Sequence, residues 1–309
     1  MNKSIIIAAA LAVSVGVANA QISPNSVWFD GDMKLLCVSA SGNTFTCNMD
    51  YWGEEPEEIT LTKTAENKFS LKGSADVRLF ANTKSVEYRV VDGHKLLIFK
   101  DSKGNVLESF ERGADNDMWE PYILNAYNYI LDGEYVDEQG TKYTISGDEF
   151  VMGGKKMNFS LDLEQYYLME MSDDNYYWWR VSTTGINIYR TKDGEYGREP
   201  GALWHKLKNV SPNGRWGFLA KEIVPGNTMW RFNSELIRLM RNEIYARHGY
   251  VFNSADLKNY FGKQPWYKPL NNNAAVKLSA IETLNVELLK GNIVAREGTD
   301  DEEIEEGLK

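Results

Sequence analysis

Cysteine and histidine are scarce in this sequence, and their scarcity excludes several classes of site. The 309 residues include two cysteines and three histidines, and His94, His205 and His248 are too far apart for metal-binding or triad spacing. No H-E-x-x-H, C-x-x-C, G-x-S-x-G or glycine-rich phosphate loop is present. We therefore predict no catalytic residue, no metal and no cofactor. Chemistry based on two carboxylates leaves no local sequence signature and stays open as an alternative.

Long apolar runs are also absent after the first twenty residues. Residues 1–20 combine a lysine, an apolar run from Ile5 to Val17 and the end Ala18-Asn19-Ala20, which is the pattern of a secretory signal peptide. The run is shorter than the ~20 residues that span a bilayer, although a retained anchor is the alternative. We predict cleavage after Ala20, a mature chain without a transmembrane segment, and a periplasmic or extracellular location.

The two cysteines lie symmetrically around a turn. Cys37 and Cys47 are equidistant from Gly42, and a three-residue loop over 41–43 would pair Ala40 with Thr44. The same register places the two thiols opposite each other. If that pair is not hydrogen-bonded, its Cβ atoms lie close enough for a disulfide. We predict a structural disulfide, with two buried free thiols or a redox pair as the alternatives.

Basic residues do not dominate, which argues against a nucleic-acid partner. The net charge is −10, and residues 297–306 contain seven acidic residues and no basic one. Between Arg231 and Lys290, nine basic residues stand against five acidic ones. This segment could contact an anionic polymer of the envelope, or it could simply have a solvated surface.

Two segments read as antiparallel β units. Apolar and polar residues alternate in several short runs of residues 27–112 and again from about 135 to 208, and turn residues separate the runs. Residues 88–100 resemble residues 179–190, which indicates a weak internal repeat. Each unit is predicted to be a lipocalin-like barrel or a rolled meander. Between them, residues 117–131 have the spacing of a short amphipathic helix.

The predicted fold class is α+β, with two β units followed by a small helical domain. The predicted organisation is a signal peptide (1–20), a first β domain (21–115), a helix with a second β domain (116–210), a linker rich in proline and glycine (211–229), a helical domain (230–292) and an acidic tail (293–309).

The helical domain begins with a helix predicted from Ser234, its cap, to about Arg247, with Gly249 as the terminator. Glu243 and Arg247 have the favourable i,i+4 spacing, and Arg247 falls in the apolar stripe. We therefore predict a structural ion pair between them. His248 at the helix end is favoured by the helix dipole and is not expected to be catalytic.

The opposite face of this helix carries Arg238, Arg241 and Tyr245, which are candidates for contact with a partner. Trp266 and Tyr267 lie in a turn bounded by prolines. They pack as a lid over a small core, or they present their rings to a sugar or a peptide.

The segment Tyr245-Ala246-Arg247-His248-Gly249, the later Trp266-Tyr267-Lys268-Pro269 and a closing helix with a capping box at 279–282 together resemble the YARHG domain family. The resemblance covers roughly residues 233–290. It implies a secreted or periplasmic bacterial protein, and it transfers no catalytic residue.

Three functions remain open on these grounds. The first is a non-catalytic binding or structural protein of the bacterial envelope, whose partner is an unknown glycan or protein. The second is a β-barrel that carries a small apolar ligand. The third is a cell-wall glycan hydrolase that uses two carboxylates.

Overall fold

The structure is a computed structural model of the whole chain. It describes residues 22–30, 33–51, 56–73, 82–113, 129–161, 168–171, 176–191, 200–224, 229 and 232–296. The predicted signal peptide, most of the helix predicted at 117–131 and the acidic residues from 297 onward lie outside the described residues.

The first β unit is a closed, eight-stranded antiparallel barrel in which each strand pairs with the next and β8 closes on β1. Its strands are β1 (Val27–Asp30), β2 (Met33–Ser41), β3 (Thr44–Tyr51), β4 (Glu57–Ala65), β5 (Lys68–Gly73), β6 (Ser85–Val91), β7 (His94–Lys100) and β8 (Val106–Arg112). Alternating apolar residues face inward, and large side chains such as Trp28, Phe69, Phe99 and Phe110 fill the core.

The hairpin that carries the cysteines has a shorter loop than the three residues predicted. β2 and β3 pair Ser41 with Thr44, so the loop contains only two residues, and Gly42 has a φ of +58° that suits glycine. Ala40 therefore pairs with Phe45, and the predicted pairing with Thr44 is wrong. A bulge between Cys37 and Ser39 inserts one extra residue and restores the predicted pairing of Cys37 with Cys47.

The second β unit is also a closed eight-stranded barrel, in which β16 closes on β9. Its strands are β9 (Gly133–Val136), β10 (Lys142–Ser146), β11 (Glu149–Met152), β12 (Lys155–Leu161), β13 (Leu168–Met171), β14 (Tyr176–Val181), β15 (Gly185–Thr191) and β16 (Pro200–Asn209). The two segments that resemble each other in sequence lie on β6–β7 and on β14–β15. These are the sixth and seventh strands of their barrels, so the weak repeat aligns equivalent positions.

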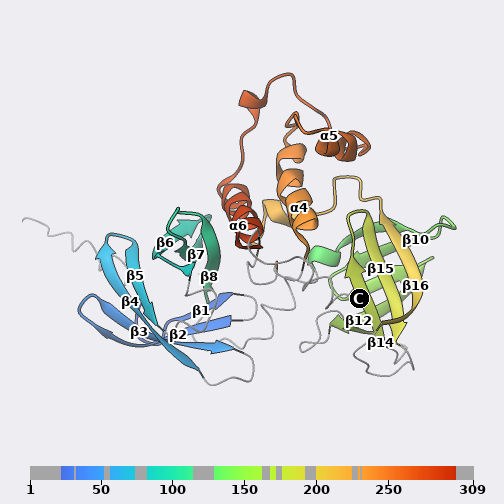
Figure 1. Cartoon of the computed structure of the whole chain (residues 1–309). Coiled ribbons are helices and arrows are strands. Elements are labelled where there is room, and N and C mark those ends of the chain that lie inside the picture. Colours follow the sequence, from blue (N-terminus) through green and yellow to red (C-terminus); the bar gives the residue numbers. More distant parts are fainter. Residues whose placement is uncertain are drawn as a thin grey trace, which may run out of the picture.

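The C-terminal part is helical, so the predicted α+β class is confirmed. Its elements are η1 (Gly217–Ala220), α4 (Ser234–Arg247), α5 (Ala255–Gly262), η2 (Asn273–Ala275) and α6 (Ala280–Arg296). The cap of α4 is Asn233 and not Ser234, because the Asn233 side chain accepts a hydrogen bond from the Leu236 N–H at 2.9 Å. α4 and α6 lie between the two barrels (Figure 1).

Helix α6 packs on the outside of the first barrel, next to β8. Strand β7 is consequently buried on both faces. Leu97 and Phe99 belong to the barrel core, whereas Leu96 and Ile98 belong to the core of the helical part. The backbones of α6 and β8 approach so closely at Gly291 that a Cβ added there would lie 1.5 Å from the Val106 carbonyl oxygen.

The segment 211–229, predicted as a linker, contributes to this same core. Trp216, Leu219, Val224 and Met229 are almost completely buried. Asn285 of α6 holds the segment in place, because its amide accepts from the Val224 N–H and donates to the carbonyls of Leu219 and Glu222, each at 2.8 Å. The described part of the segment is therefore a fixed connection between the second barrel and α4.

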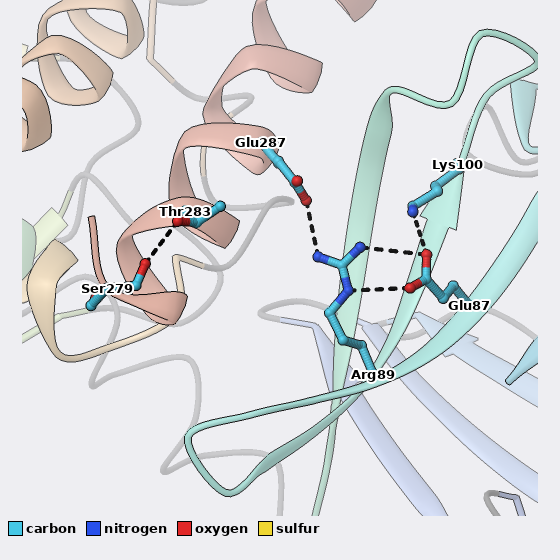
Figure 2. Close-up of polar contacts among 6 residues, drawn as sticks. All are labelled: Glu87, Arg89, Lys100, Ser279, Thr283 and Glu287. Carbon is cyan, nitrogen blue, oxygen red and sulfur yellow. Dashed lines mark hydrogen bonds and ion pairs between the residues drawn. The ribbon is translucent and has the colours of Figure 1, made fainter. Parts of the chain in front are cut away.

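An ion network links the first barrel to α6 (Figure 2). Arg89 on β6 lies between Glu87 on the same strand, at 3.3 Å, and Glu287 on α6, at 3.0 Å. Lys100 on β7 also contacts Glu87. Although desolvation opposes the shift, the hydrogen bonds from Lys100 and Arg89 lower the pKa of Glu87.

This network predicts a pH-dependent contribution to stability. A carboxyl group with a lowered pKa stabilises the fold above its unfolded pKa, and the contribution is lost as the pH falls through its folded pKa. We expect Glu87→Gln to lower the free energy of unfolding by about 1 kcal/mol at neutral pH, and by much less below about pH 3. Urea denaturation at both pH values measures this, with Glu58→Gln at an exposed strand position as the control. Equal losses for the two variants would contradict the prediction.

Candidate functional site

The C-terminal end of α4 contains the sequence motif and lies against the core. The apolar stripe predicted for this helix is buried, with Leu236, Ile237, Met240 and Ile244 at 2% exposure or less. Ala246 is buried as well. The helix ends as predicted, since His248 is the C-cap residue and Gly249 follows with a φ of +75°.

The carboxylate of Glu243 lies at the centre of this site. Its Oε1 accepts hydrogen bonds from Arg247 Nη2 at 2.9 Å, from Arg247 Nε at 3.2 Å and from the Trp216 backbone N–H at 2.7 Å. Burial raises the pKa of Glu243, while the charge of Arg247 and the Trp216 hydrogen bond oppose that rise. The pair therefore joins α4 to the segment that precedes it.

Two glycines allow this segment to approach the ion pair. A Cβ at Gly214 would lie 2.7 Å from Glu243 Oε1 and 2.9 Å from Arg247 Nη2, and one at Gly217 would lie 3.3 Å from the same nitrogen. Gly214 also has a φ of +91°, which other residues rarely adopt. The Pro/Gly-rich composition read as a linker thus reflects close packing.

Arg215 is a second buried guanidinium beside the pair. It donates hydrogen bonds to the carbonyls of Ser182 and of Gly185, the latter at 2.6 Å, and its charge lies 4.9 Å from the centroid of the Trp216 ring. Burial lowers the pKa of Arg215, and Glu243 partly compensates. Because Ser182 and Gly185 flank the β14–β15 turn, Arg215 fastens the second barrel to the helical part. Sequence analysis missed this residue.

His248 connects the ends of two helices. Its Nε2 lies 2.8 Å from Glu282 Oε1, and Glu282 Oε2 accepts from the Ser279 N–H at 2.8 Å. The Glu282 N–H in turn donates to Ser279 Oγ at 3.1 Å, so the predicted capping box of α6 is confirmed. His248 thus extends that box to the C-terminus of α4. This is a structural use of the imidazole.

Trp266 and Tyr267 are half-buried against the same core. The Tyr267 hydroxyl donates to the Tyr250 carbonyl at 2.7 Å, and both rings lie about 6 Å from Phe261. The Arg247 guanidinium is 5.9 Å from the Trp266 ring centroid. This geometry matches the lid interpretation, and it leaves only part of each ring for a partner.

The face of α4 expected to contact a partner is partly covered. Arg238 forms an ion pair with Asp256 of α5, and its side chain is 38% exposed. Arg241 and Tyr245 are half-buried, and Tyr245 packs against the core. Within the described residues, no group of three His, Cys, Asp or Glu could hold a metal ion. No described helix is long and apolar enough to cross a membrane.

Comparison with protein families gives a match that coincides with this site. Residues 226–291 match the family model of the YARHG domain. The C-terminal domain is a YARHG domain. Searches of curated proteins and of solved structures each found no significant match. YARHG domains usually occur in extracellular or envelope proteins.

In this YARHG domain, several residues of the motif that gives the family its name make contacts that stabilise the fold. Arg247 pairs with Glu243, His248 with Glu282, and Gly249 ends the helix. A Cβ at Gly249 would also lie 2.6 Å from the Lys268 carbonyl oxygen, so the helix end contacts the Trp-Tyr-Lys-Pro turn. The motif builds the junction of α4, α6 and the turn.

The core of the YARHG domain extends beyond the matched residues. Trp216 and Leu219 precede residue 226, yet both are buried with α4 and α6. Leu96, Ile98 and Val106 of the first barrel complete the other side of the same core. The hydrophobic core of the domain therefore includes residues from the preceding segment and from the first barrel.

Proposed function

We propose that this chain is a non-catalytic binding protein of the bacterial envelope, secreted to the periplasm or beyond after cleavage at Ala20. The observation that carries the proposal is the structural use of the YARHG motif. Glu243, Arg247 and His248 are engaged in ion pairs and capping contacts, and the domain contacts both barrels. In this proposal the YARHG domain fixes the two barrels relative to each other, and the barrels contact the partner.

The alternative of a carrier for an apolar ligand receives less support. The cluster inside the first barrel includes Trp28, Phe69, Phe99 and Phe110, all 1% exposed or less. Inside the second barrel, Tyr135, Phe150 and Trp179 are buried to the same degree. Eight-stranded barrels either fill with side chains or hold one small ligand, and these residues favour the first arrangement.

The proposal is tested with residues 21–309 and isolated bacterial envelope. We expect the folded protein to sediment with the envelope fraction, and we expect Arg238→Met, which alters only the partly exposed Arg238–Asp256 pair, to do the same. Release of a soluble product from the glycan would identify an enzyme. Absence of the protein from the sedimented envelope would equally contradict the proposal.

We also infer that Cys37 and Cys47 form a disulfide in an oxidising compartment. Both side chains are fully buried, the thiols are free in this structure, and the residues pair directly. The Cys37 N–H donates to the Ser26 carbonyl at 2.9 Å, and its own carbonyl accepts from the Asn25 N–H at 2.8 Å. Its backbone groups therefore point away from Cys47, which is the close, non-hydrogen-bonded type of pair that suits a disulfide.

The disulfide predicts a redox-dependent stability. Oxidation would transfer two electrons and release two protons to a disulfide donor of the compartment. We expect the oxidised protein to be more stable than the reduced one by about 3 kcal/mol, since the cross-link restricts a loop of about ten residues in the unfolded chain. Urea denaturation with and without reductant measures the difference. The Cys37→Ser/Cys47→Ser variant should not respond to reductant. Two titratable thiols in denatured protein from the periplasm would contradict the inference.

A further inference from the structure

A chain of hydrogen bonds joins Asp137, Tyr143 and His205 at one end of the second barrel. The Tyr143 hydroxyl lies 2.8 Å from Asp137 Oδ2 and 3.1 Å from His205 Nδ1. Asp137 follows β9, Tyr143 lies on β10 and His205 on β16. The three meet because β9 pairs with both β10 and β16 when the barrel closes.

The geometry fixes which atoms carry the protons in this chain. The other oxygen of Asp137 accepts two backbone N–H groups, from Gln139 at 3.0 Å and Thr141 at 2.8 Å, as an ionised carboxylate does. The single hydroxyl proton of Tyr143 is therefore donated to Asp137. The Tyr143 oxygen then accepts, so His205 donates from Nδ1–H.

His205 Nε2 is consequently a hydrogen-bond acceptor. Burial lowers the pKa of His205, which keeps the ring neutral and leaves a lone pair on Nε2. Nε2 is buried, and within the part of the chain that the structure describes it has no hydrogen-bond partner. A buried acceptor without a donor is unfavourable, so its retention needs an explanation.

Aromatic rings and a cation lie near this imidazole. Trp204 stacks on Tyr177, with ring centroids 4.4 Å apart, and lies 4.2 Å from the His205 ring. Arg190 is exposed, and its guanidinium is 5.7 Å from the Trp204 ring. Trp204 is itself only half-buried. Arg190 and part of Trp204 are therefore accessible near one end of β15, whereas Tyr177 belongs to the barrel core and Arg215 contacts Gly185 at the other end of β15.

We propose that this end of the second barrel binds a saccharide, whose hydroxyl donates to His205 Nε2 and whose ring packs against Arg190 and the exposed part of Trp204. A neutral hydroxyl is the donor that Nε2 lacks. An ionised carboxylate has no proton to donate to it, a cation is repelled by Arg190, and a hydrocarbon leaves it unpaired. Because Nε2 is buried, side chains around His205 must move when the saccharide enters. This inference rests on the proposed binding function and names the site and the ligand class.

The first test reads the protonation of His205 directly in the full mature chain. Correlation spectra of the ¹⁵N-labelled imidazole should show a neutral ring protonated at Nδ1, with Nε2 as an acceptor. Tyr143→Phe should weaken the preference for this tautomer. A ring protonated at Nε2 in the wild-type protein would overturn the inference, because the site would then have no acceptor to offer.

The second test uses two neutral probes, the β-1,4-linked tetramer of N-acetylglucosamine and maltotetraose. Binding of either should change the tryptophan fluorescence and be measurable by calorimetry. His205→Asn keeps a donor near Nδ1 and removes the acceptor, so we expect affinity to fall by at least about tenfold. His205→Gln restores an acceptor near the Nε2 position and should lose less.

The outcomes separate this inference from the proposed function. No binding of either tetrasaccharide, or equal affinity for His205→Asn and wild type, would overturn the saccharide site. If His205→Asn does not fold, Trp204→Leu at a half-buried position must lose the affinity instead. Retention of the protein on the envelope in either case would leave the proposed function supported with a partner bound elsewhere. Loss of envelope retention with intact tetrasaccharide binding would contradict the proposed function alone.

Discussion

Replacement of Arg247 by methionine is expected to lower the free energy of unfolding by about 3–5 kcal/mol at neutral pH. Methionine preserves much of the side-chain volume next to Trp266 but removes the charge that compensates Glu243. The Glu243 side chain is only 2% exposed, so water cannot replace the guanidinium. The Trp216 N–H would remain its principal donor. Urea denaturation monitored by fluorescence and circular dichroism measures the loss.

Arg238→Met is the matched control, because it removes an arginine of the same helix from a different ion pair. The side chains of Arg238 and Asp256 are 38% and 59% exposed. Water screens such an exposed pair, so the control should lose much less stability than Arg247→Met. If both methionine variants lose the same stability, the structural reading of the YARHG motif is wrong.

The pH dependence of the Arg247→Met variant provides an independent check. Without Arg247, burial should raise the pKa of Glu243 further. A raised carboxyl pKa means that the folded state binds the proton more tightly, so the stability of the variant falls as the pH rises through that pKa. The difference from wild type should therefore be smaller at about pH 5 than at about pH 8. A difference that does not change with pH would mean that lost packing, rather than the unpaired charge, causes the destabilisation.

The sequence contains enough local information to predict the strands, the hairpin of the cysteines and the ion pair within α4. Pairings between neighbouring residues have a short-range signal, such as the i,i+4 spacing of Glu243 and Arg247. Closure of each barrel pairs its first and last strands, for example Trp28 with Arg112 and Tyr135 with Asn209. No local sequence pattern predicts pairs between strands so far apart in the sequence. This is why a barrel and a meander could not be distinguished.

The apolar run on β7 is a signal that could have been used. Residues 96–99 are all apolar, which is typical of a strand that is buried on both faces. The equivalent strand β15 alternates, with Ile186 and Ile188 in the core and Asn187 and Tyr189 half-buried. The difference indicates that the first barrel, and not the second at this strand, carries a covering element. The structure places α6 there.

The residues that contact Glu243 from outside the YARHG motif could not be predicted from the sequence. Trp216 and Gly214 reach Glu243 from about thirty residues upstream, in a segment whose glycines and proline indicated a linker. Arg215 has no sequence signal for burial, since arginine is usually exposed. The hydrogen bonds that join Asp137, Tyr143 and His205 could not be predicted either, because these residues meet only when the barrel closes.

Replacement of Gly291 by alanine is expected to be the most damaging change at the junction of the barrel and the YARHG domain. The added Cβ would lie 1.5 Å from the Val106 carbonyl oxygen and 2.7 Å from its carbon, so backbone rather than a flexible side chain is in the way. Helix α6 would have to move away from β8 and expose Leu96, Ile98 and Val106. Overpacking usually costs about 1–3 kcal/mol. Here we expect a loss of at least about 3 kcal/mol, because the contact involves two rigid elements.

Gly262→Ala supplies the matched control for this change. Gly262 also lies in a helix, but a Cβ there would meet nothing within 4 Å, so alanine should be neutral or stabilising by up to about 1 kcal/mol. For Gly291→Ala alone, calorimetry should show either a single unfolding transition at a lower temperature or a separate unfolding transition of the first barrel. Equal unfolding temperatures for the two variants would mean that α6 does not pack against β8. A separated transition with envelope binding retained would instead show that the barrels bind without being held together, which contradicts the scaffold role proposed for the YARHG domain.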